Sequence, residues 1–154
     1  MRNLVAVAIL LFLIVETNCF SQTLKEQLLG KWKLNEDEAM EIFLNSPLIK
    51  QQPKEAYNKT IEWTKQVFDN SYMNFYSLDS MTSTVIDRKE IIQDKSAWKI
   101  READSVITYR IRFTPFIQQS KVLKITEDEL VLVYYNKKRK VEPYKSKYKK
   151  VGNN

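Results

Sequence analysis

The chain has 154 residues, of which 29% are charged, and its formal net charge is +6 at pH 7. It contains no histidine, which removes the commonest general base and the commonest metal ligand. This composition excludes a Ser-His-Asp triad and a zinc site, and the single cysteine, Cys19, excludes an internal disulfide.

The first 21 residues have the pattern of a cleavable secretory signal. Arg2 supplies a positive start, and Leu4 to Val15 form an apolar run of 12 residues, shorter than the roughly 20 that span a bilayer. Small residues at Cys19 and Ser21 predict cleavage after Ser21, which leaves one domain, 22–154. A lipoprotein lipidated at Cys19 is the alternative, although Glu16 and Asn18 fit a lipobox poorly. We therefore expect a periplasmic or secreted protein.

Helical patterns dominate the first half of residues 22–154. Residues 23–30 resemble a helical turn that ends at Gly30, and 31–34 alternate as in a strand. Asn35, followed by Glu38, has the spacing of a capping box for the next helix. Pro53 predicts the start of a longer amphipathic helix that runs to about residue 69.

From Ser71 onward the apolar period changes to two, which is typical of strands. Polar clusters, including Gln93–Asp94, predict the turns. At 130–135 both the odd and the even positions are apolar, which predicts a strand covered on both faces. With 31–34, about eight short antiparallel strands predict a barrel or a sandwich. The predicted later strands are 71–77, 81–87, 95–101, 105–113, 120–126, 129–136 and 140–150.

Four motifs resemble small exported bacterial lipocalin-like (calycin) domains. They are the Gly-x-Trp of Leu28–Leu34, the second-strand motif Tyr72–Phe75, the mid-barrel motif Ser96–Ile100 and the late hairpin Ile125–Leu132. The resemblance implies an eight-stranded barrel with a helical insert between its first two strands. Departures are the long insert at 35–70 and Ser96-Ala97 in place of a glycine motif. An α+β fold, with a helix packed on a curved antiparallel sheet, is the alternative.

The resemblance also implies a role for the Gly-x-Trp pair, Gly30 and Trp32, at the closed base of the barrel. In that family a basic side chain of the last strand packs over the tryptophan ring. Here Lys145, Lys147 or Lys149 would supply this cation.

Aromatic side chains are the candidate lining of a ligand cavity, because a barrel of this size holds either side chains or one small ligand. Packing of these residues in a filled core is the alternative. The candidate lining residues are Trp63, Phe75, Trp98, Tyr109, Phe113, Tyr134, Tyr144 and Tyr148.

The whole charge excess lies at the C-terminal end, where residues 121–154 hold 10 basic and 4 acidic residues. Such lysines protect sheet surfaces from aggregation, and they also attract anionic surfaces. The candidate residues for an anionic partner are Lys137, Lys138, Arg139, Lys140, Lys145 and Lys147.

Three function hypotheses follow, of which a hydrolase or isomerase that uses only carboxylates, tyrosine or lysine is the weakest. The first is an exported, non-enzymatic domain that binds a small apolar or amphipathic ligand. The second is an interaction module with a filled core that binds an anionic partner through its lysine-rich last strand. No catalytic motif is present, and we expect no cofactor, no metal and no nucleic-acid partner. The acidic clusters Glu36–Glu38 and Glu127–Glu129 are interpreted as a helix start and a hairpin turn.

Overall fold

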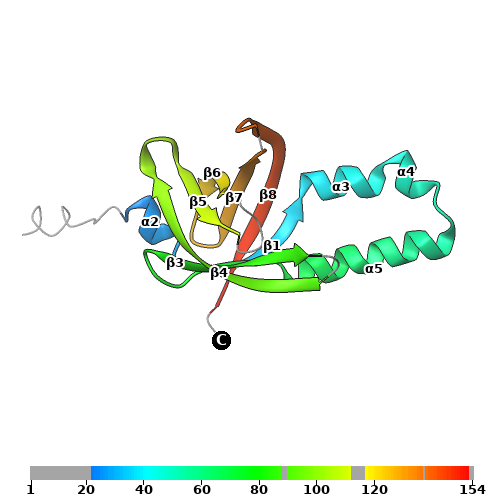
Figure 1. Cartoon of the computed structure of the whole chain (residues 1–154), viewed down its shortest axis with the longest axis horizontal. Coiled ribbons are helices and arrows are strands. Elements are labelled where there is room, and N and C mark those ends of the chain that lie inside the picture. The colour runs from blue at the N-terminus through cyan, green and yellow to red at the C-terminus, as the bar shows by residue number, and fades with distance from the viewer. Residues whose placement is uncertain (1–21, 88–89, 112–116, 137, 153–154) are drawn as a thin grey trace, which may run out of the picture.

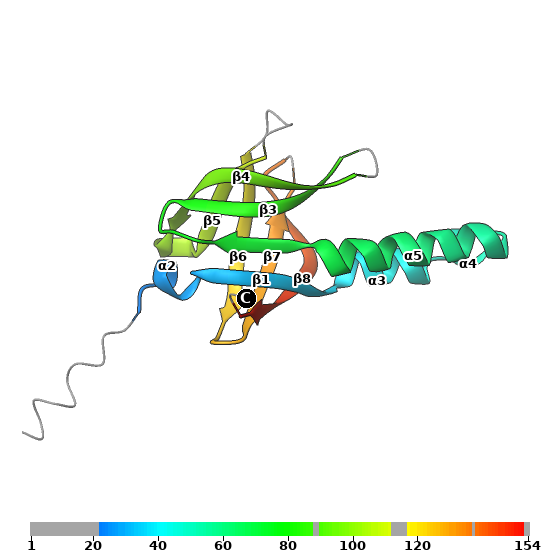
Figure 2. The ribbon, with the colours of Figure 1, turned by 90° about the horizontal axis from the view of Figure 1, so that it is seen from below.

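The structure is a computed structural model that describes residues 22–87, 90–111, 117–136 and 138–152. Eight antiparallel strands pair in chain order and close into a barrel, because β1 also pairs with β8 (Figure 1, Figure 2). The mainly β, eight-stranded barrel predicted from the sequence is confirmed. The strands are β1 (Gly30–Asp37), β2 (Tyr72–Phe75), β3 (Ser80–Asp87), β4 (Glu90–Arg101), β5 (Val106–Arg110), β6 (Ile117–Ile125), β7 (Glu129–Tyr135) and β8 (Val141–Val151).

The alternation of apolar and polar residues sets which face of each strand lines the barrel interior. In β5, Ile107 and Tyr109 are buried, while Arg110 on the opposite face is exposed. Strand β7 is buried on both faces, as the sequence predicted. Its outer valines, Val131 and Val133, pair laterally with lysines of β6 and β8. We infer that the aliphatic stems of those lysines cover them.

One predicted turn is wrong. Gln93–Asp94 was interpreted as a turn because both residues are polar, but they lie within β4, and Asp94 pairs with Ser83 of β3. Asp94 and Ser83 are only 3% and 4% exposed. Polar residues therefore point into the barrel here. Assigning every polar cluster to a turn does not identify such inward-facing residues.

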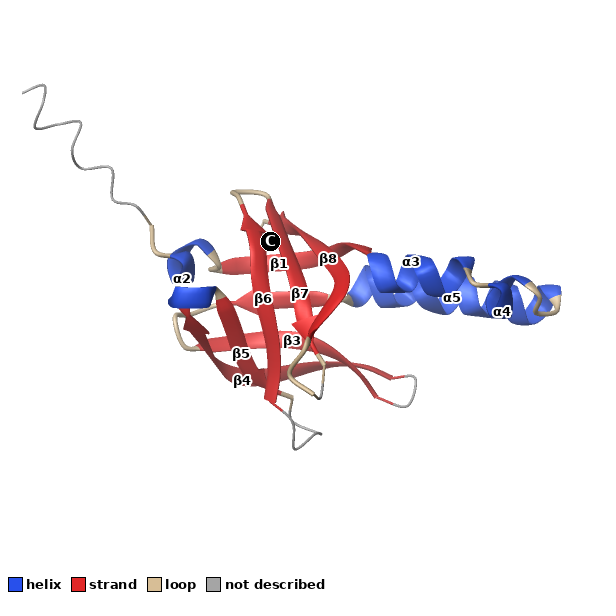
Figure 3. Cartoon of the chain, turned by 90° about the horizontal axis from the view of Figure 1, so that it is seen from above, coloured by secondary structure: helices blue, strands red, loops and turns tan. Residues whose placement is uncertain are grey.

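Three helices connect β1 to β2 and project from the barrel as an arm (Figure 3). They are α3 (Glu38–Asn45), α4 (Pro47–Lys50) and α5 (Lys54–Asn70). The predicted insert is confirmed, but its cap is Asp37 rather than Asn35, because β1 continues to pair with β8 through Asp37. The helices do not lie across a curved sheet, so the α+β alternative is wrong. Among the described residues, no helix combines the length and apolarity needed to cross a bilayer.

The base of the barrel is closed by helix α2 (Leu24–Gln27) and a tightly packed Gly30–Trp32 pair. Trp32 is fully buried, and its Nε1 donates a hydrogen bond to the Leu28 carbonyl at 2.8 Å. Lys150 places its ammonium 4.9 Å from the centre of the Trp32 ring. The cation over Trp32 therefore comes from Lys150, not from Lys145, Lys147 or Lys149, because even-numbered residues of β8 face inward around Ser146 and Tyr148.

Candidate functional site

The barrel interior holds one buried cluster in which apolar side chains next to α2, called the floor, pack together with tyrosines. The floor lies next to α2, where Phe75 and Trp98 meet edge to face with ring centres 4.7 Å apart. Both rings are almost fully buried, as are Met81 and Leu132 nearby in the same cluster. Lys25 of α2 lies 5.7 Å from the Trp98 ring centre and helps to close this end. The floor is thus a packed apolar surface.

Above the floor, three tyrosines from three different strands point inward. The Tyr134 and Tyr148 hydroxyls lie 2.5 Å apart and form a hydrogen bond. Tyr109 and Tyr148 are 7% and 6% exposed, whereas Tyr134 is only half-buried. Burial raises the pKa of all three phenols above the ordinary value of 10.0, and the proximity of the other phenols adds to this. All three are neutral at physiological pH, so each can donate a hydrogen bond.

Two serine hydroxyls on the interior face make no well-aligned hydrogen bond among the described residues, although that of Ser120 lies close enough to Tyr109 to lower the pKa of its phenol. Ser96 Oγ and Ser120 Oγ are both buried. Ser120 is laterally paired with Ile107 and Tyr134, which face inward, and Ser96 shares a face of β4 with Trp98. Buried polar groups in proteins are normally satisfied by protein atoms or by water. We call Ser96, Tyr109, Ser120, Tyr134 and Tyr148 the interior polar cluster.

Asp37 connects this part of the barrel to the helical arm. One carboxylate oxygen accepts a hydrogen bond from the Met40 backbone N–H at 2.9 Å, which caps α3. The other accepts from the hydroxyl of Ser146, which is 2% exposed, at 2.5 Å. The negative charge of Asp37 also contributes to raising the pKa of Tyr134 and Tyr148. Asp37 therefore fixes the arm to the strand that carries Tyr148.

The structure divides the predicted lining residues into three groups. Five lie inside the barrel: Phe75, Trp98, Tyr109, Tyr134 and Tyr148.

Two predicted lining residues lie elsewhere, and one cannot be placed. Trp63 belongs to α5 in the arm, and Tyr144 is 39% exposed. Tyr144 leaves the interior because the β7–β8 register shifts between Val133 and Tyr135, opposite a stretch that contains Pro143. Phe113 lies outside the described residues. The interpretation of Trp63 and Tyr144 as lining residues is wrong.

Sequence reasoning missed the polar residues of the interior. Ser83, Asp94, Ser120 and Ser146 are each at most 4% exposed. The signal was present, because each of them alternates in register with buried residues of its own strand. It was overlooked because only aromatic residues were considered as lining.

The candidate anionic-partner residues lie along β8 and the turn before it. Lys138, Arg139 and Lys140 are exposed, and no ion pair involves them in the part of the chain that the structure describes. Lys147 forms an ion pair with Glu36, at 2.5 Å, which raises the pKa of the lysine and lowers that of the carboxylate.

Lys145 is exposed, and its backbone N–H donates to Glu38, at 3.0 Å, which does not engage the charge of its side chain. Lys137 lies outside the described residues. The exposed basic charge of this set therefore lies in the turn and at Lys145 of the strand.

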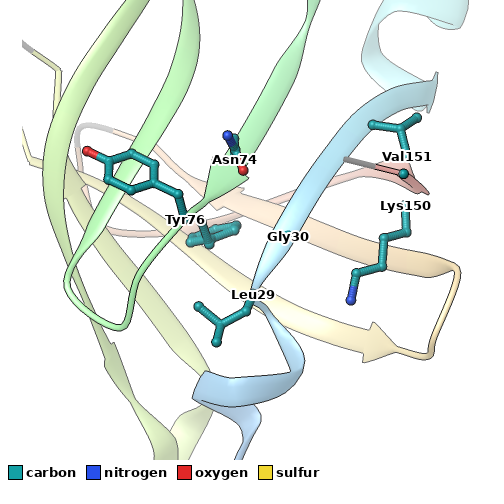
Figure 4. A pocket seen from close by; sticks show the side chains of 8 residues that line it. Leu29, Gly30, Asn74, Tyr76, Lys150 and Val151 are labelled. Carbon is teal, nitrogen blue, oxygen red and sulfur yellow. The ribbon is translucent and has the colours of Figure 1, made fainter. Parts of the chain in front are cut away.

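A surface pocket of about 750 Å³ lies outside the barrel base, beside Gly30 (Figure 4). Leu29, Asn74, Tyr76 and Lys150 line it from β1, β2 and β8. Its one ammonium, on Lys150, already lies against Trp32. We infer that this pocket is formed by the residues that close the base of the barrel and is not a ligand site. Among the described residues, no three His, Cys, Asp or Glu side chains are grouped as a metal site would require.

Comparison with known proteins gives no further guide to this barrel. No protein-family model, no curated protein and no solved structure matches the chain. The fold is an eight-stranded antiparallel barrel consistent with a lipocalin-like architecture, and function has to be argued from the interior and the surface.

Proposed function

We propose that this protein is an exported, non-catalytic, lipocalin-like domain that binds one small amphipathic molecule inside its barrel. The apolar part of the ligand would lie against the floor formed by Phe75 and Trp98. Its polar end would contact the interior polar cluster. The observation that carries this proposal is the set of buried hydroxyls on the interior face, of which that of Ser96 lacks a partner among the described residues. A well-packed filler core rarely leaves such groups unsatisfied.

The chemistry of the cluster favours a neutral polar end. Three neutral phenols and two serine hydroxyls can donate to a carbonyl or exchange hydrogen bonds with a hydroxyl. The carboxyl group of Asp37, which accepts a hydrogen bond from Ser146 on this wall, disfavours an anionic end. A long-chain alcohol, ester or amide therefore fits better than a fatty acid.

Binding of a fluorescently labelled long-chain alcohol tests the proposal. Ser120→Leu places a larger apolar side chain next to Tyr134 and is expected to abolish binding. The control, Thr82→Leu, introduces the same side chain on the outer face of β3 and should leave binding unchanged. Tyr148→Phe removes one hydroxyl and should weaken binding by roughly fivefold. If wild type and Ser120→Leu bind equally, the ligand is not in the barrel and the proposal fails.

Export is tested separately, by cell fractionation and by the mass of the protein purified from its natural cells. A soluble exported form beginning at Gln22 is expected. A lipid adduct on Cys19, or an intact N-terminus in the cytoplasm, would contradict simple secretion.

The second candidate function is an interaction module that binds an anionic partner. It is favoured by the exposed Lys138, Arg139 and Lys140, which form no ion pair in the described part of the chain. Binding through several such charges should weaken steeply as ionic strength rises. A partner whose affinity is independent of salt would exclude this surface.

A further inference from the structure

Gln22 lies at the base of the barrel, directly before helix α2. It precedes Thr23, the N-cap of α2, and α2 is at the end of the barrel opposite the helical arm (Figure 3). Cleavage after Ser21 would make Gln22 the amino-terminal residue of the exported protein. An N-terminal glutamine carries both a nucleophilic amine and a side-chain amide, so the surroundings of Gln22 decide what these two groups can do.

The backbone on the C-terminal side of Gln22 is held in place. Its carbonyl accepts a hydrogen bond from Gln27 Nε2 at 3.0 Å. The Thr23 backbone N–H donates to the Glu26 carboxylate at 2.9 Å, and the Thr23 hydroxyl accepts from the Glu26 N–H at 3.2 Å, which is a capping box. The peptide bond that joins Gln22 to the domain is therefore hydrogen-bonded at both its carbonyl and its N–H.

The side chain of Gln22, in contrast, is exposed. Its amide makes no hydrogen bond within the part of the chain that the structure describes, because the contact with Gln27 uses the backbone carbonyl. Gln22 also borders a surface hollow of about 510 Å³, which Glu26, Thr126 and Glu127 line as well. The side chain thus has room to fold back toward its own amine, and no described contact opposes this.

We propose that Gln22 becomes pyroglutamate once the signal is removed, which gives the exported protein a closed and uncharged amino terminus. This inference rests on the proposed export, because only cleavage after Ser21 frees the Gln22 amine. The amine nitrogen attacks the side-chain amide carbon Cδ, the new N–Cδ bond closes a γ-lactam, and the Cδ–Nε2 bond breaks. The leaving nitrogen takes the proton that the amine gives up and departs as ammonia, so no oxidant or second reactant is needed.

Closure of the ring leaves the fold as it is. All ring atoms belong to Gln22, so the capping box of Thr23 and the hydrogen bond from Gln27 are retained. Both reacting groups are carried by one residue, which makes the attack intramolecular. A fraction of α-amino groups is neutral near neutral pH, and the neutral form is the nucleophile. The product lacks the terminal charge and the free amine that aminopeptidases require.

The N-terminal peptide of the protein purified from its natural cells tests the proposal. Free amines are labelled in the cell extract before purification, which records the terminus as the cell leaves it. Digestion after glutamate then releases residues 22–26 for mass spectrometry. We expect this peptide to carry no label on its terminus and to be lighter than the unmodified peptide by the mass of one ammonia. Pyroglutamyl peptidase should remove its first residue.

Gln22→Asn is the matched control. It keeps a primary amide and the residues before the cleavage site, but its side chain is one methylene too short to close a γ-lactam. The first peptide of this variant should carry the label on its terminus, and an aminopeptidase should remove its first residue while leaving the wild-type protein intact. The urea unfolding midpoints of the two proteins should be equal, because the Gln22 amide makes no hydrogen bond within the described residues.

Three results would overturn the proposal, and the first two leave export standing. A labelled terminus on a wild-type peptide that begins at Gln22 would show that the protein is cleaved as proposed but is not cyclised. A blocked terminus in Gln22→Asn as well would assign the block to another modification. A terminus at any other residue would contradict the proposed cleavage and, with it, the reaction.

Discussion

Replacing Asp37 with alanine is expected to destabilise the protein far more than an exposed carboxylate normally would. The change removes the N-cap of α3, which typically costs about 1 kcal/mol. It also leaves the hydroxyl of Ser146, 2% exposed, without its partner, which costs about 1–3 kcal/mol. Together the free energy of unfolding should fall by about 2–4 kcal/mol, and Tm by roughly 10 °C. Urea unfolding followed by circular dichroism measures the first quantity, and calorimetry the second.

Two variants distinguish this reasoning from a general sensitivity of the region. Glu36→Ala removes an exposed ion pair with Lys147 and should destabilise the protein much less than Asp37→Ala does. Ser146→Ala combined with Asp37→Ala should be less damaging than the sum of the single changes, because the two share one hydrogen bond. If Asp37→Ala costs no more than Glu36→Ala, the link between arm and barrel is not what the structure indicates.

Two further predictions concern the buried phenols and the glycines. Burial keeps Tyr109, Tyr134 and Tyr148 protonated in the native state above pH 10.0, while the unfolded chain loses these protons. The contribution of the phenols to stability should therefore be constant below that pH and decline above it by up to about 1.4 kcal/mol per pH unit for each phenol. Tyrosinate absorbance should then rise for these three residues only as circular dichroism shows unfolding, and their reversible ionisation in a folded protein would contradict the prediction. Gly30→Ala should cost about 1–3 kcal/mol, because Gly30 has a φ of 119° and an added Cβ would lie 2.8 Å from a lysine side chain. Gly152→Ala is the matched control, since nothing lies within 4 Å of its added Cβ, and equal unfolding midpoints for the two variants would refute the argument.

The order and type of the strands could be predicted because most strands have one face on the interior and one on solvent, while β7 is apolar on both faces. The alternation of apolar and polar residues from Ser71 onward follows from that geometry. The prediction based on it failed at Gln93–Asp94, where the interior face is itself polar. It also failed at Tyr144, where a register shift in the β7–β8 pair turns the side chain outward. Bulges of this kind reverse which alternate residues of a strand face the interior, and a single sequence does not show where they occur.

The helical insert could be predicted from its period, but its placement could not. An amphipathic stripe usually predicts packing against the main core. Trp63, which lies beside this stripe, is predicted as a lining residue because it is aromatic. In the structure α5 packs in the arm, and Leu48 of α4 is left exposed. Where an apolar stripe finds its partner is decided by tertiary contacts, which periodicity does not encode.

The candidate site was predicted in part. Aromatic residues identified the floor correctly at Phe75 and Trp98, and the phenols at Tyr109 and Tyr148. The buried hydroxyls of Ser120 and Ser96 were not foreseen, because an isolated serine in a strand is more often on the surface. The chemistry that most favours ligand binding thus became visible only when register and burial were known.

Native mass spectrometry tests the central claim most directly. The protein would be purified from the cells that make it naturally and measured before and after organic extraction. We predict an additional mass that extraction releases, belonging to one small neutral amphipathic molecule and absent from Ser120→Leu. A bare protein mass, unchanged after incubation with a lipid extract of the same cells, would contradict the proposal that the barrel carries a ligand.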